Sequence, residues 1–290
     1  MTNFKAMTVL VLGASGMLGN AVLRSLGVDP RYAVFGTVRN KANRDRLPIS
    51  LRPRVRIGID VEDFDALTRL FADVRPDAVI NCIGVVKQVE NSDDPLTVLP
   101  INAVLPHRLA GLSALARARF VHISTDCVFD GRDGNYNEGD RPNAEDLYGR
   151  SKLLGEVDAA HAVTLRTSII GHELGTSHGL VEWFLAQQNP VKGYRRAVFS
   201  GIPTVELARI IKDVVLPRPS LRGLYHVSAD PISKHDLLGL VAEEYGKQTE
   251  IVADDAIRID RSLDSSRFRA ETGYEPPAWV DLVRSMRRFG

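Results

Sequence analysis

The sequence predicts an α/β protein with a doubly wound parallel sheet and a smaller, mainly helical lobe toward the C-terminus. Short apolar runs alternate with segments whose apolar residues recur at helical spacing through the first half of the chain. Continuous apolar runs are typical of strands buried on both faces, as in a parallel sheet covered by helices. The 290 residues, 44% hydrophobic and 25% charged, can bury such a core.

The elements of the first half follow one another along the chain. The expected strands are residues 8–12, 33–38, 55–59, 77–82, 120–124 and 162–167. The expected helices are residues 16–26, 63–74, 95–118 and 146–160. We expect a break or kink at Pro106, because proline lacks a backbone N–H and its ring clashes with the preceding turn. Right-handed crossovers between the strands then give the doubly wound arrangement.

The alternation loosens in the second half of the chain. The expected helices are residues 180–188, 205–215, 234–245 and 279–288, with one strand at residues 224–227. Helices with few strands indicate a smaller lobe, partly interleaved with the sheet.

Charge and cysteine content exclude several classes of protein. Lysine and arginine total 37 and aspartate and glutamate 36, so the net charge of +1 gives no overall signature of nucleic-acid or membrane binding. Two cysteines are too few for a disulfide framework or a zinc cage. The N-terminal apolar run is shorter than a signal peptide requires, and no run approaches the ~18 apolar residues of a membrane span. We therefore expect a cytoplasmic protein without a metal, membrane or nucleic-acid partner.

Three glycines follow the first expected strand at a spacing typical of dinucleotide-binding turns. Gly13 permits the tight turn, Gly16 the close approach of a pyrophosphate, and Gly19 the close packing of helix on sheet. The helix start adds N–H donors and a partial positive charge. The expected phosphate contacts are Gly13, Ser15, Gly16, Met17, Leu18 and Gly19. The alternative is a glycine-rich turn without a ligand.

These patterns define an expected domain organisation. A Rossmann-type NAD(P)-binding domain spans residues 1–170, and part of residues 195–230 returns to it. An interleaved substrate-binding lobe spans residues 171–290. A homodimer is the default oligomer for a soluble protein.

The second expected strand ends beside a basic segment. Arg39 stands where this fold faces the adenosine ribose, and an arginine suits the 2′-phosphate of NADPH. The basic residues that follow it are Lys41, Arg44 and Arg46. We therefore expect NADPH, with NADH as the alternative cofactor and a solvated basic loop as the alternative to a site. Asp60 and Val61, after the third strand, are expected near the adenine.

Tyr148 and Lys152 are four residues apart on an expected helix and therefore share one face of it. An ammonium beside a phenol favours the phenolate, so we expect Lys152 to lower the pKa of Tyr148 toward neutrality. Such a tyrosine can act as general acid or base on an alcohol or carbonyl oxygen. Ser124, Thr125 and Asp126 end the fifth expected strand, at the edge where open α/β sheets bind ligands. The alternative is an ordinary surface pair on a helix.

Four motifs carry a resemblance to a known family. They are the glycine turn and residues 81–84, 124–131 and 148–156. Together they resemble extended short-chain dehydrogenases/reductases, and most closely the dTDP-4-dehydrorhamnose reductase branch. The resemblance runs nearly end to end, because further segments occur in the order of that branch: residues 166–168, 203–204, 223–226 and 262–264.

The resemblance implies a mechanism. Nicotinamide delivers hydride to C4 of a 4-keto sugar, and Tyr148 donates a proton to the developing alkoxide. Lys152 tunes Tyr148 and holds the nicotinamide ribose, while Thr125, or Ser124, hydrogen-bonds the substrate oxygen. The residues expected beside the cofactor ribose and nicotinamide are Asn81, Cys82 and Gly84. The residues expected to reach substrate are Lys87, Gln88, Asp126, His178 and Arg195, with plain loops as the alternative.

Three departures from the branch bear on the substrate. Ile169 and Ile170 follow residues 166–168, where the rhamnose enzymes usually carry an aromatic residue over the sugar. Cys127 stands where the branch often has tyrosine, and residues 81–88 differ from its usual alanine-rich form.

The expected function is NADPH-dependent reduction of a nucleotide-linked 4-keto-6-deoxy sugar in polysaccharide precursor synthesis. An epimerase with bound NAD is a second interpretation; a dehydratase loses support because Cys127 replaces the usual glutamate. A non-catalytic regulatory subunit, like the β subunit of methionine adenosyltransferase, is the third. That role usually tolerates loss of the catalytic set, which this chain keeps.

Overall fold

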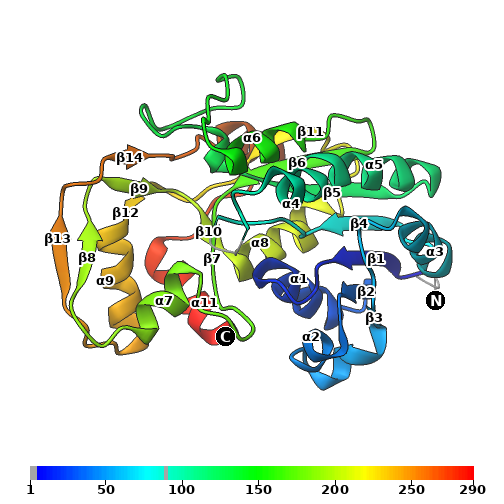
Figure 1. Ribbon diagram of the computed structural model, residues 1–290, viewed down its shortest axis with the longest axis horizontal. Coiled ribbons are helices and arrows are strands. Elements are labelled where there is room, and N and C mark those ends of the chain that lie inside the picture. The colour runs from blue at the N-terminus through cyan, green and yellow to red at the C-terminus, as the bar shows by residue number, and fades with distance from the viewer. Residues whose placement is uncertain (1–4, 88–90) are drawn as a thin grey trace.

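The computed structural model describes residues 5–87 and 91–290, and a parallel sheet of seven strands lies at its centre (Figure 1). In the order of their pairing, the strands are β11 (Gly223–His226), β6 (Ala162–Thr167), β5 (Arg119–Thr125), β4 (Ala78–Asn81), β1 (Met7–Leu12), β2 (Tyr32–Val38) and β3 (Val55–Ile57). The chain winds outward from β1 in both directions, which confirms the predicted doubly wound sheet.

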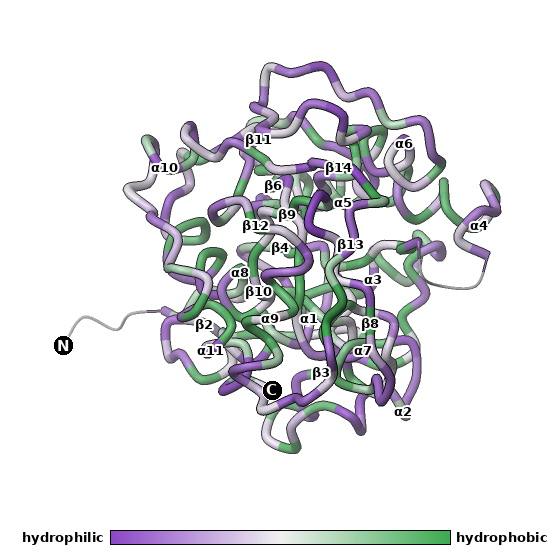
Figure 2. Tube along the Cα trace, turned by 90° about the vertical axis from the view of Figure 1, so that its left-hand side faces the viewer, coloured by the Kyte–Doolittle hydropathy of each residue, from purple (hydrophilic) through white to green (hydrophobic). Residues whose placement is uncertain are grey.

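Alternate residues of each strand pack against helices on opposite faces of the sheet. Val9 and Val11 belong to the core on one face, and Leu10 and Leu12 to the core on the other; all four are fully buried. The main covering helices are α1 (Met17–Gly27) and α8 (Thr204–Ile210) on the first face, and α3 (Phe64–Val74) and α5 (Leu105–Leu115) on the second. Figure 2 shows hydrophobic segments in the middle of the molecule and polar segments in the outer loops.

The segment before β5 is one helical stretch in three parts. α4 (Pro95–Leu99) leads into a π-helical turn, η2 (Pro100–Val104), and then into α5. The irregularity expected at Pro106 lies one turn earlier, because Pro106 has no N–H to offer the Asn102 carbonyl and a wider turn accommodates that loss. Gly155 packs beside this carbonyl, where a Cβ would lie 1.9 Å from the Asn102 oxygen.

The stretch Pro95–Leu115 is, by length and composition, the one helix in the described residues that could cross a membrane. Leu105 and Leu109 on it are buried against the sheet. A core helix of a globular domain passes the same test, so the stretch is weak evidence for a membrane span.

Two other elements end earlier than the sequence predicts. The helix expected at residues 146–160 is α6 (Leu147–Leu154), because Gly155 ends it. The strand expected at residues 55–59 ends at Ile57, where Gly58 turns the chain with a φ of +76°. The remaining short helices of this half are α2 (Lys41–Asp45), η1 (Ile49–Arg54) and η3 (Asp126–Val128).

The region after residue 168 is smaller and holds more strands than expected (Figure 1). Its helices besides α8 are η4 (Ile211–Val215), α7 (Leu180–Ala186), α9 (Lys234–Tyr245), α10 (Ser266–Thr272) and α11 (Trp279–Phe289). Its short strands are β7 (Ile169–Ile170), β8 (Val191–Tyr194), β9 (Ala197–Phe199), β10 (Ile202–Pro203), β12 (Ile232–Ser233), β13 (Ile251–Asp254) and β14 (Ile259–Asp260). Segments this short cannot show the alternation that identifies a strand.

The two halves of the chain are interleaved. β11 pairs with β6 at the edge of the central sheet, and α8 packs against α1 in the same core. In the other direction, Tyr136 in the loop after β5 forms a β-bridge with Leu263. These connections hold the smaller region beside the carboxyl ends of the strands.

Candidate active site

β1 and β4 end level with each other, and the neighbouring β5 continues beyond them to Thr125. Leu12 pairs with Asn81, and Asn81 pairs with His122. The turn after β1, the loop after β4 and the residues that end β5 therefore meet at one edge of the sheet, which is where ligands bind in this fold.

The glycine turn after β1 is held by close backbone packing. Gly13 has a φ of +80°, and a Cβ on it would lie 2.8 Å from Ile83. A Cβ on Gly19 would lie 2.0 Å from the Gly13 carbonyl oxygen. Both positions therefore require glycine for the fold itself.

Gly16 is different, because a Cβ there would meet only the Gly13 oxygen at 3.4 Å. No side chain caps α1 at Gly16, so the first N–H groups of the helix remain available to a ligand. Ser15 and Met17 flank this open position, and Leu18 is buried behind it. The turn thus fits the pyrophosphate of a dinucleotide, with Gly16 at the point of closest approach.

In the basic segment after β2, some side chains are exposed and others already have partners within the protein. Arg39 is exposed and forms no ion pair within the described chain. Arg44 pairs with its neighbour Asp45, and Arg46 donates to the Leu174 carbonyl oxygen at 3.0 Å. Lys41 is exposed.

The residues expected near the adenine follow β3 after a turn. Asp60 is exposed and accepts a hydrogen bond from the Glu62 amide at 3.0 Å. Val61 is half-buried against the core that includes Leu10 and Leu12.

The loop after β4 is shaped by two buried asparagines. Asn81 accepts from the Ile83 amide at 3.1 Å, and its Nδ2 lies 3.3 Å from His122 Nδ1. Asn102, from the π-helical turn, accepts from the Val85 amide and donates to the Val85 carbonyl, each at 2.9 Å. Gly84 is exposed within this loop, whereas Cys82 packs against the core. Sequence reasoning missed Asn102, although its position before Pro106 was a signal.

Thr125 and Tyr148 lie side by side at the end of β5. Thr125 Oγ1 donates to Asp126 Oδ1 and accepts from the Cys127 amide, both at 3.1 Å, and it lies near enough to Tyr148 to affect the pKa of that phenol. Asp146 caps the start of α6 by accepting from the Gly149 amide at 2.9 Å, which fixes the turn that carries Tyr148.

Lys87 completes this side of the cluster. Its Nζ lies 2.9 Å from Asp146 Oδ2 and 5.5 Å from the centre of the Tyr148 ring. Of the expected substrate contacts, Lys87 and Asp126 are therefore brought to Tyr148.

Burial controls the acid–base properties of the pair on α6. It raises the pKa of Tyr148 above its usual value, and the nearby Thr125 hydroxyl only partly opposes this. The expectation that Lys152 lowers the pKa of Tyr148 is therefore wrong for the protein without ligands. The Lys152 ammonium instead donates to the Ile123 carbonyl oxygen at 2.7 Å, and burial lowers its pKa to about 8.

Ser124 and Thr125 point to opposite faces of β5, because side chains alternate along a strand. Ser124 Oγ donates to Glu156 Oε1 at 2.6 Å, and Arg166 holds the same carboxylate through two bonds of 2.7 Å. Ser124 thus lies on the face with Glu156, whereas Thr125 lies beside Tyr148 and is the candidate donor to a substrate oxygen. Sequence reasoning missed the role of Glu156, although it continues the four-residue spacing of Tyr148 and Lys152.

Asp126 is buried beside Thr125, and Cys127 next to it is half-buried. Burial raises the pKa of the Asp126 carboxyl, which forms no ion pair with any described residue. Burial also raises the pKa of the Cys127 thiol to about 12, which disfavours a thiolate nucleophile.

Of the other expected substrate contacts, Arg195 and His178 are not joined to this cluster. Arg195 forms an exposed ion pair with Asp255 beyond β8. His178 is exposed in the loop before α7, next to Gly179, where a Cβ would lie 2.9 Å from Met17 of the glycine turn. Gln88 lies outside the described residues.

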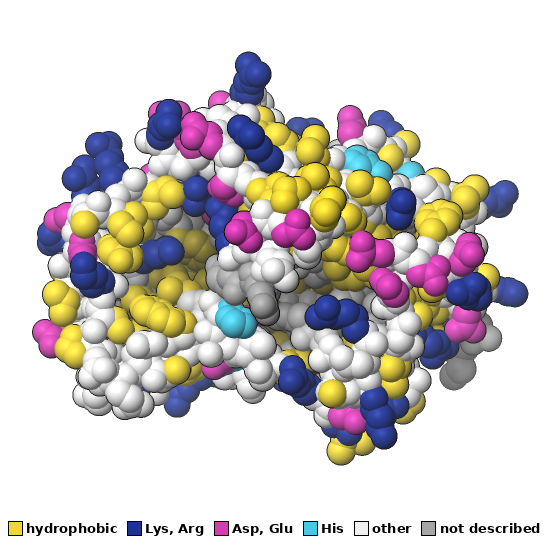
Figure 3. All heavy atoms as spheres, viewed as in Figure 1, with side chains coloured by type: hydrophobic (Ala, Val, Ile, Leu, Met, Phe, Trp, Pro, Cys, Tyr) yellow, Lys and Arg dark blue, Asp and Glu magenta, His cyan; other side chains and the backbone are white. Residues whose placement is uncertain are grey.

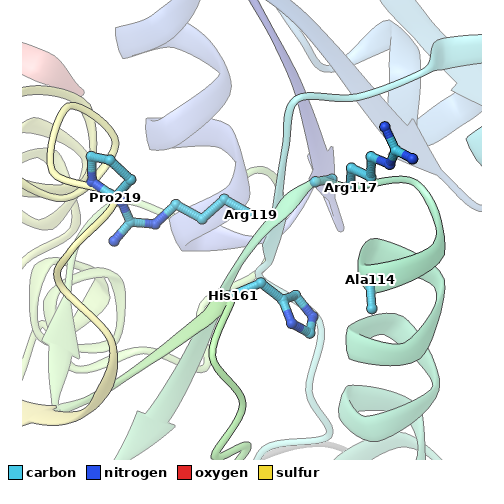
Figure 4. A pocket seen from close by; sticks show the side chains of 6 residues that line it. Ala114, Arg117, Arg119, His161 and Pro219 are labelled. Carbon is cyan, nitrogen blue, oxygen red and sulfur yellow. The ribbon is translucent and has the colours of Figure 1, made fainter.

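The face that carries these segments is hollowed between the sheet and the smaller region, and lysine and arginine side chains lie along the hollow (Figure 3). A separate hollow of about 320 Å³ lies at the opposite edge of the sheet. Arg119, which begins β5, lines it with Arg117 and His161 (Figure 4), and both Arg119 and His161 bind backbone carbonyls there. The described residues contain no cluster able to hold a metal ion.

Comparison with known proteins identifies the family. A model described as the RmlD substrate binding domain matches residues 7–287. The chain belongs to this family. It is an extended short-chain dehydrogenase/reductase of the dTDP-4-dehydrorhamnose reductase type, as the motifs predicted.

Individual relatives differ in what they do. The probable low-salt glycan biosynthesis reductase Agl14 of Haloferax volcanii is 34% identical over 97% of this chain and 97% of its own. The methionine adenosyltransferase 2 subunit beta of Danio rerio is 28% identical over 82% of this chain and 73% of its own. The dTDP-4-dehydrorhamnose reductase of Bacillus anthracis in complex with NADP has a similar fold, with a TM-score of 0.81 over the whole of both chains at 21% identity.

Proposed function

We propose that the protein is an NADPH-dependent reductase of a nucleotide-linked 4-keto-6-deoxy sugar in polysaccharide precursor synthesis, acting in the cytoplasm. The observation that carries the proposal is the joining of Thr125, Tyr148 and Lys152 at the sheet edge that also holds the glycine turn. The similarity to Agl14, a probable glycan biosynthesis reductase, supports the same class of reaction.

The cofactor would lie on residues 13–19, with Arg39 at its 2′-phosphate and Asn81 and Gly84 toward its nicotinamide end. The open position at Gly16 fits this placement. When bound, NADPH supplies the hydride. Residues 1–170 and the returning segment with α8 and β11 would then form the cofactor side, and the rest of residues 171–290 the substrate side.

The residues of the chain supply the proton and stabilise the oxyanion. Tyr148 keeps its proton at neutral pH because burial raises its pKa, so it can protonate an alkoxide at C4. Lys152, whose ammonium donates to the Ile123 carbonyl oxygen, would hold the nicotinamide ribose, and Thr125 would donate a hydrogen bond to the same substrate oxygen. Lys87, beside the Tyr148 ring, would bind an anionic group of the substrate.

The test is turnover of NADPH by the purified protein with a panel of nucleotide-linked 4-keto sugars. We expect absorbance at 340 nm to fall with at least one sugar, and the Tyr148→Phe variant to show no turnover. Failure with every sugar of a broad panel would overturn the proposal.

A regulatory role is the second candidate, because methionine adenosyltransferase 2 subunit beta is among the relatives. Capture of a stoichiometric enzyme partner together with absence of turnover would favour it. An epimerase would instead be purified with tightly bound NAD, which denaturation and absorbance at 260 nm would reveal.

A further inference from the structure

Glu156 stands at the centre of a buried polar chain behind the Tyr148–Lys152 pair. Ser124 and Arg166 both donate to its carboxylate, and the side chain of Arg166 is only 4% exposed. Arg166 Nη1 lies 3.3 Å from His226 Nε2, and His226 Nδ1 lies 2.9 Å from the Tyr136 carbonyl oxygen. This series of hydrogen-bonded side chains therefore runs across the ends of β5, β6 and β11.

His226 cannot replace Glu156 as a partner for Arg166. Arg166 can only donate, so Nε2 of His226 must be the acceptor and Nδ1 the protonated nitrogen that donates to Tyr136. Burial, together with the charge of Arg166, lowers the pKa of His226 to about 4, so the ring is neutral. Glu156 is thus the carboxylate that neutralises Arg166 among the described residues.

The same carboxylate is linked to Lys152 in two ways. Glu156 directly follows Gly155, which ends the helix that carries Lys152, and the charge of Glu156 opposes the effect of burial on the pKa of Lys152. Through Ser124, Glu156 also anchors the strand end whose Ile123 carbonyl accepts from Lys152 Nζ.

The other groups around Lys152 do not supply a negative charge. From β5, His122 is fully buried and its pKa lies well below the usual value, so it is neutral. From α6 itself, Tyr148 is neutral because its pKa is raised. From β6, Arg166 is a cation held by Glu156.

We propose that Glu156 is a positioning residue for the reaction: its carboxylate holds the end of β5 through Ser124 and supplies the negative charge that keeps Lys152 protonated. This inference rests on the proposed function for its kinetic consequence. The protonation of Lys152 is independent of that function and can be measured without substrate.

The direct measurement is an NMR titration of ε-¹³C-labelled lysines without cofactor, with the Lys152 signal assigned by its loss in Lys152→Met. We expect Lys152 to titrate near pH 8 in the native protein and about one pH unit or more lower in Glu156→Gln. The matched control is Ser124→Ala, which removes the hydrogen bond and keeps the charge, and should leave the titration within about 0.3 units.

The kinetic measurement is the pH profile of kcat. Lys152 must be charged, so kcat falls as pH rises through its pKa, and Glu156→Gln should move this fall to lower pH. At pH 8 we expect a loss of about fivefold or more relative to the native enzyme, with a smaller loss at pH 6. Glu156→Asp, which keeps the charge, should restore the pH at which kcat falls.

Glu156→Gln leaves Arg166 without a counter-ion and can destabilise the fold. If the single variant unfolds, the double variant Glu156→Gln/Arg166→Met is compared with Arg166→Met, so that the two proteins differ only in the charge of residue 156. An unchanged Lys152 titration in Glu156→Gln, or equal titrations in that second pair of variants, would overturn the proposal and reduce Glu156 to a structural residue. A shifted titration without turnover would support Glu156 and count against the proposed reductase instead.

Discussion

Two glycines of the same turn should respond differently to the addition of one methyl group. In Gly19→Ala the new Cβ would lie 2.0 Å from the Gly13 carbonyl oxygen, so α1 must move away from the turn by about 1 Å. Overpacking of this kind costs about 1–3 kcal/mol, which lowers the melting temperature by roughly 2–10 °C in a chain of this size. Displaced helix amides should also weaken NADPH binding by about tenfold or more.

Gly16→Ala is the matched control, because its Cβ would meet the Gly13 oxygen only at 3.4 Å. We expect a melting temperature within about 1–2 °C of the native value, yet a loss of NADPH affinity similar to that of Gly19→Ala. Thermal unfolding followed by circular dichroism gives the first quantity, and fluorescence titration with NADPH gives the second. Native affinity in Gly16→Ala would refute the placement of the pyrophosphate, and native stability in Gly19→Ala would refute the packing.

Three further predictions concern single side chains. Tyr148→Phe should abolish reduction and change the Kd for NADPH less than about twofold by calorimetry; turnover at the native rate would remove Tyr148 as proton donor. Arg39→Asp should shift the ratio of kcat/KM for NADPH over NADH at least about tenfold toward NADH, and an unchanged ratio would remove Arg39 from the site. The free energy of unfolding should rise between about pH 8 and pH 10, by at most about 3 kcal/mol relative to Lys152→Met, because the unfolded chain binds the lysine proton more tightly than the folded one. Urea unfolding at several pH values measures it, and a parallel dependence in the variant would contradict it.

The sequence predicts the central sheet well because its strands are buried on both faces. Runs such as residues 9–12 of β1 are apolar throughout, and a strand covered on both faces is the environment that fits them best. The strands β7, β10, β12 and β14 have two residues each and carry no such pattern. Their pairing is set by segments distant in sequence, as when β9 lies between β12 and β14.

Spacing along the chain locates catalytic residues but does not determine their environment. The pair Tyr148 and Lys152 could be found from a four-residue interval, whereas the raised pKa of Tyr148 depends on how much of the side chain the fold covers. The sequence also places Ser124 and Thr125 together at the end of a strand. Only the three-dimensional structure shows that Thr125 lies beside Tyr148, while Ser124 donates a hydrogen bond to Glu156.

This division explains why two adjacent hydroxyl residues end β5. Thr125, on one face of the strand, lies beside Tyr148, the proposed proton donor. Ser124, on the other face, links the same backbone to the Glu156–Arg166 pair, so the position of Thr125 does not depend on a flexible loop. The carbonyl oxygen of Ile123, also on β5, accepts a hydrogen bond from Lys152. The end of β5 therefore positions Thr125 directly and contacts Lys152 of α6. A reaction that must protonate an oxyanion in place benefits from such a rigid strand end, since its groups need no rearrangement as charge develops.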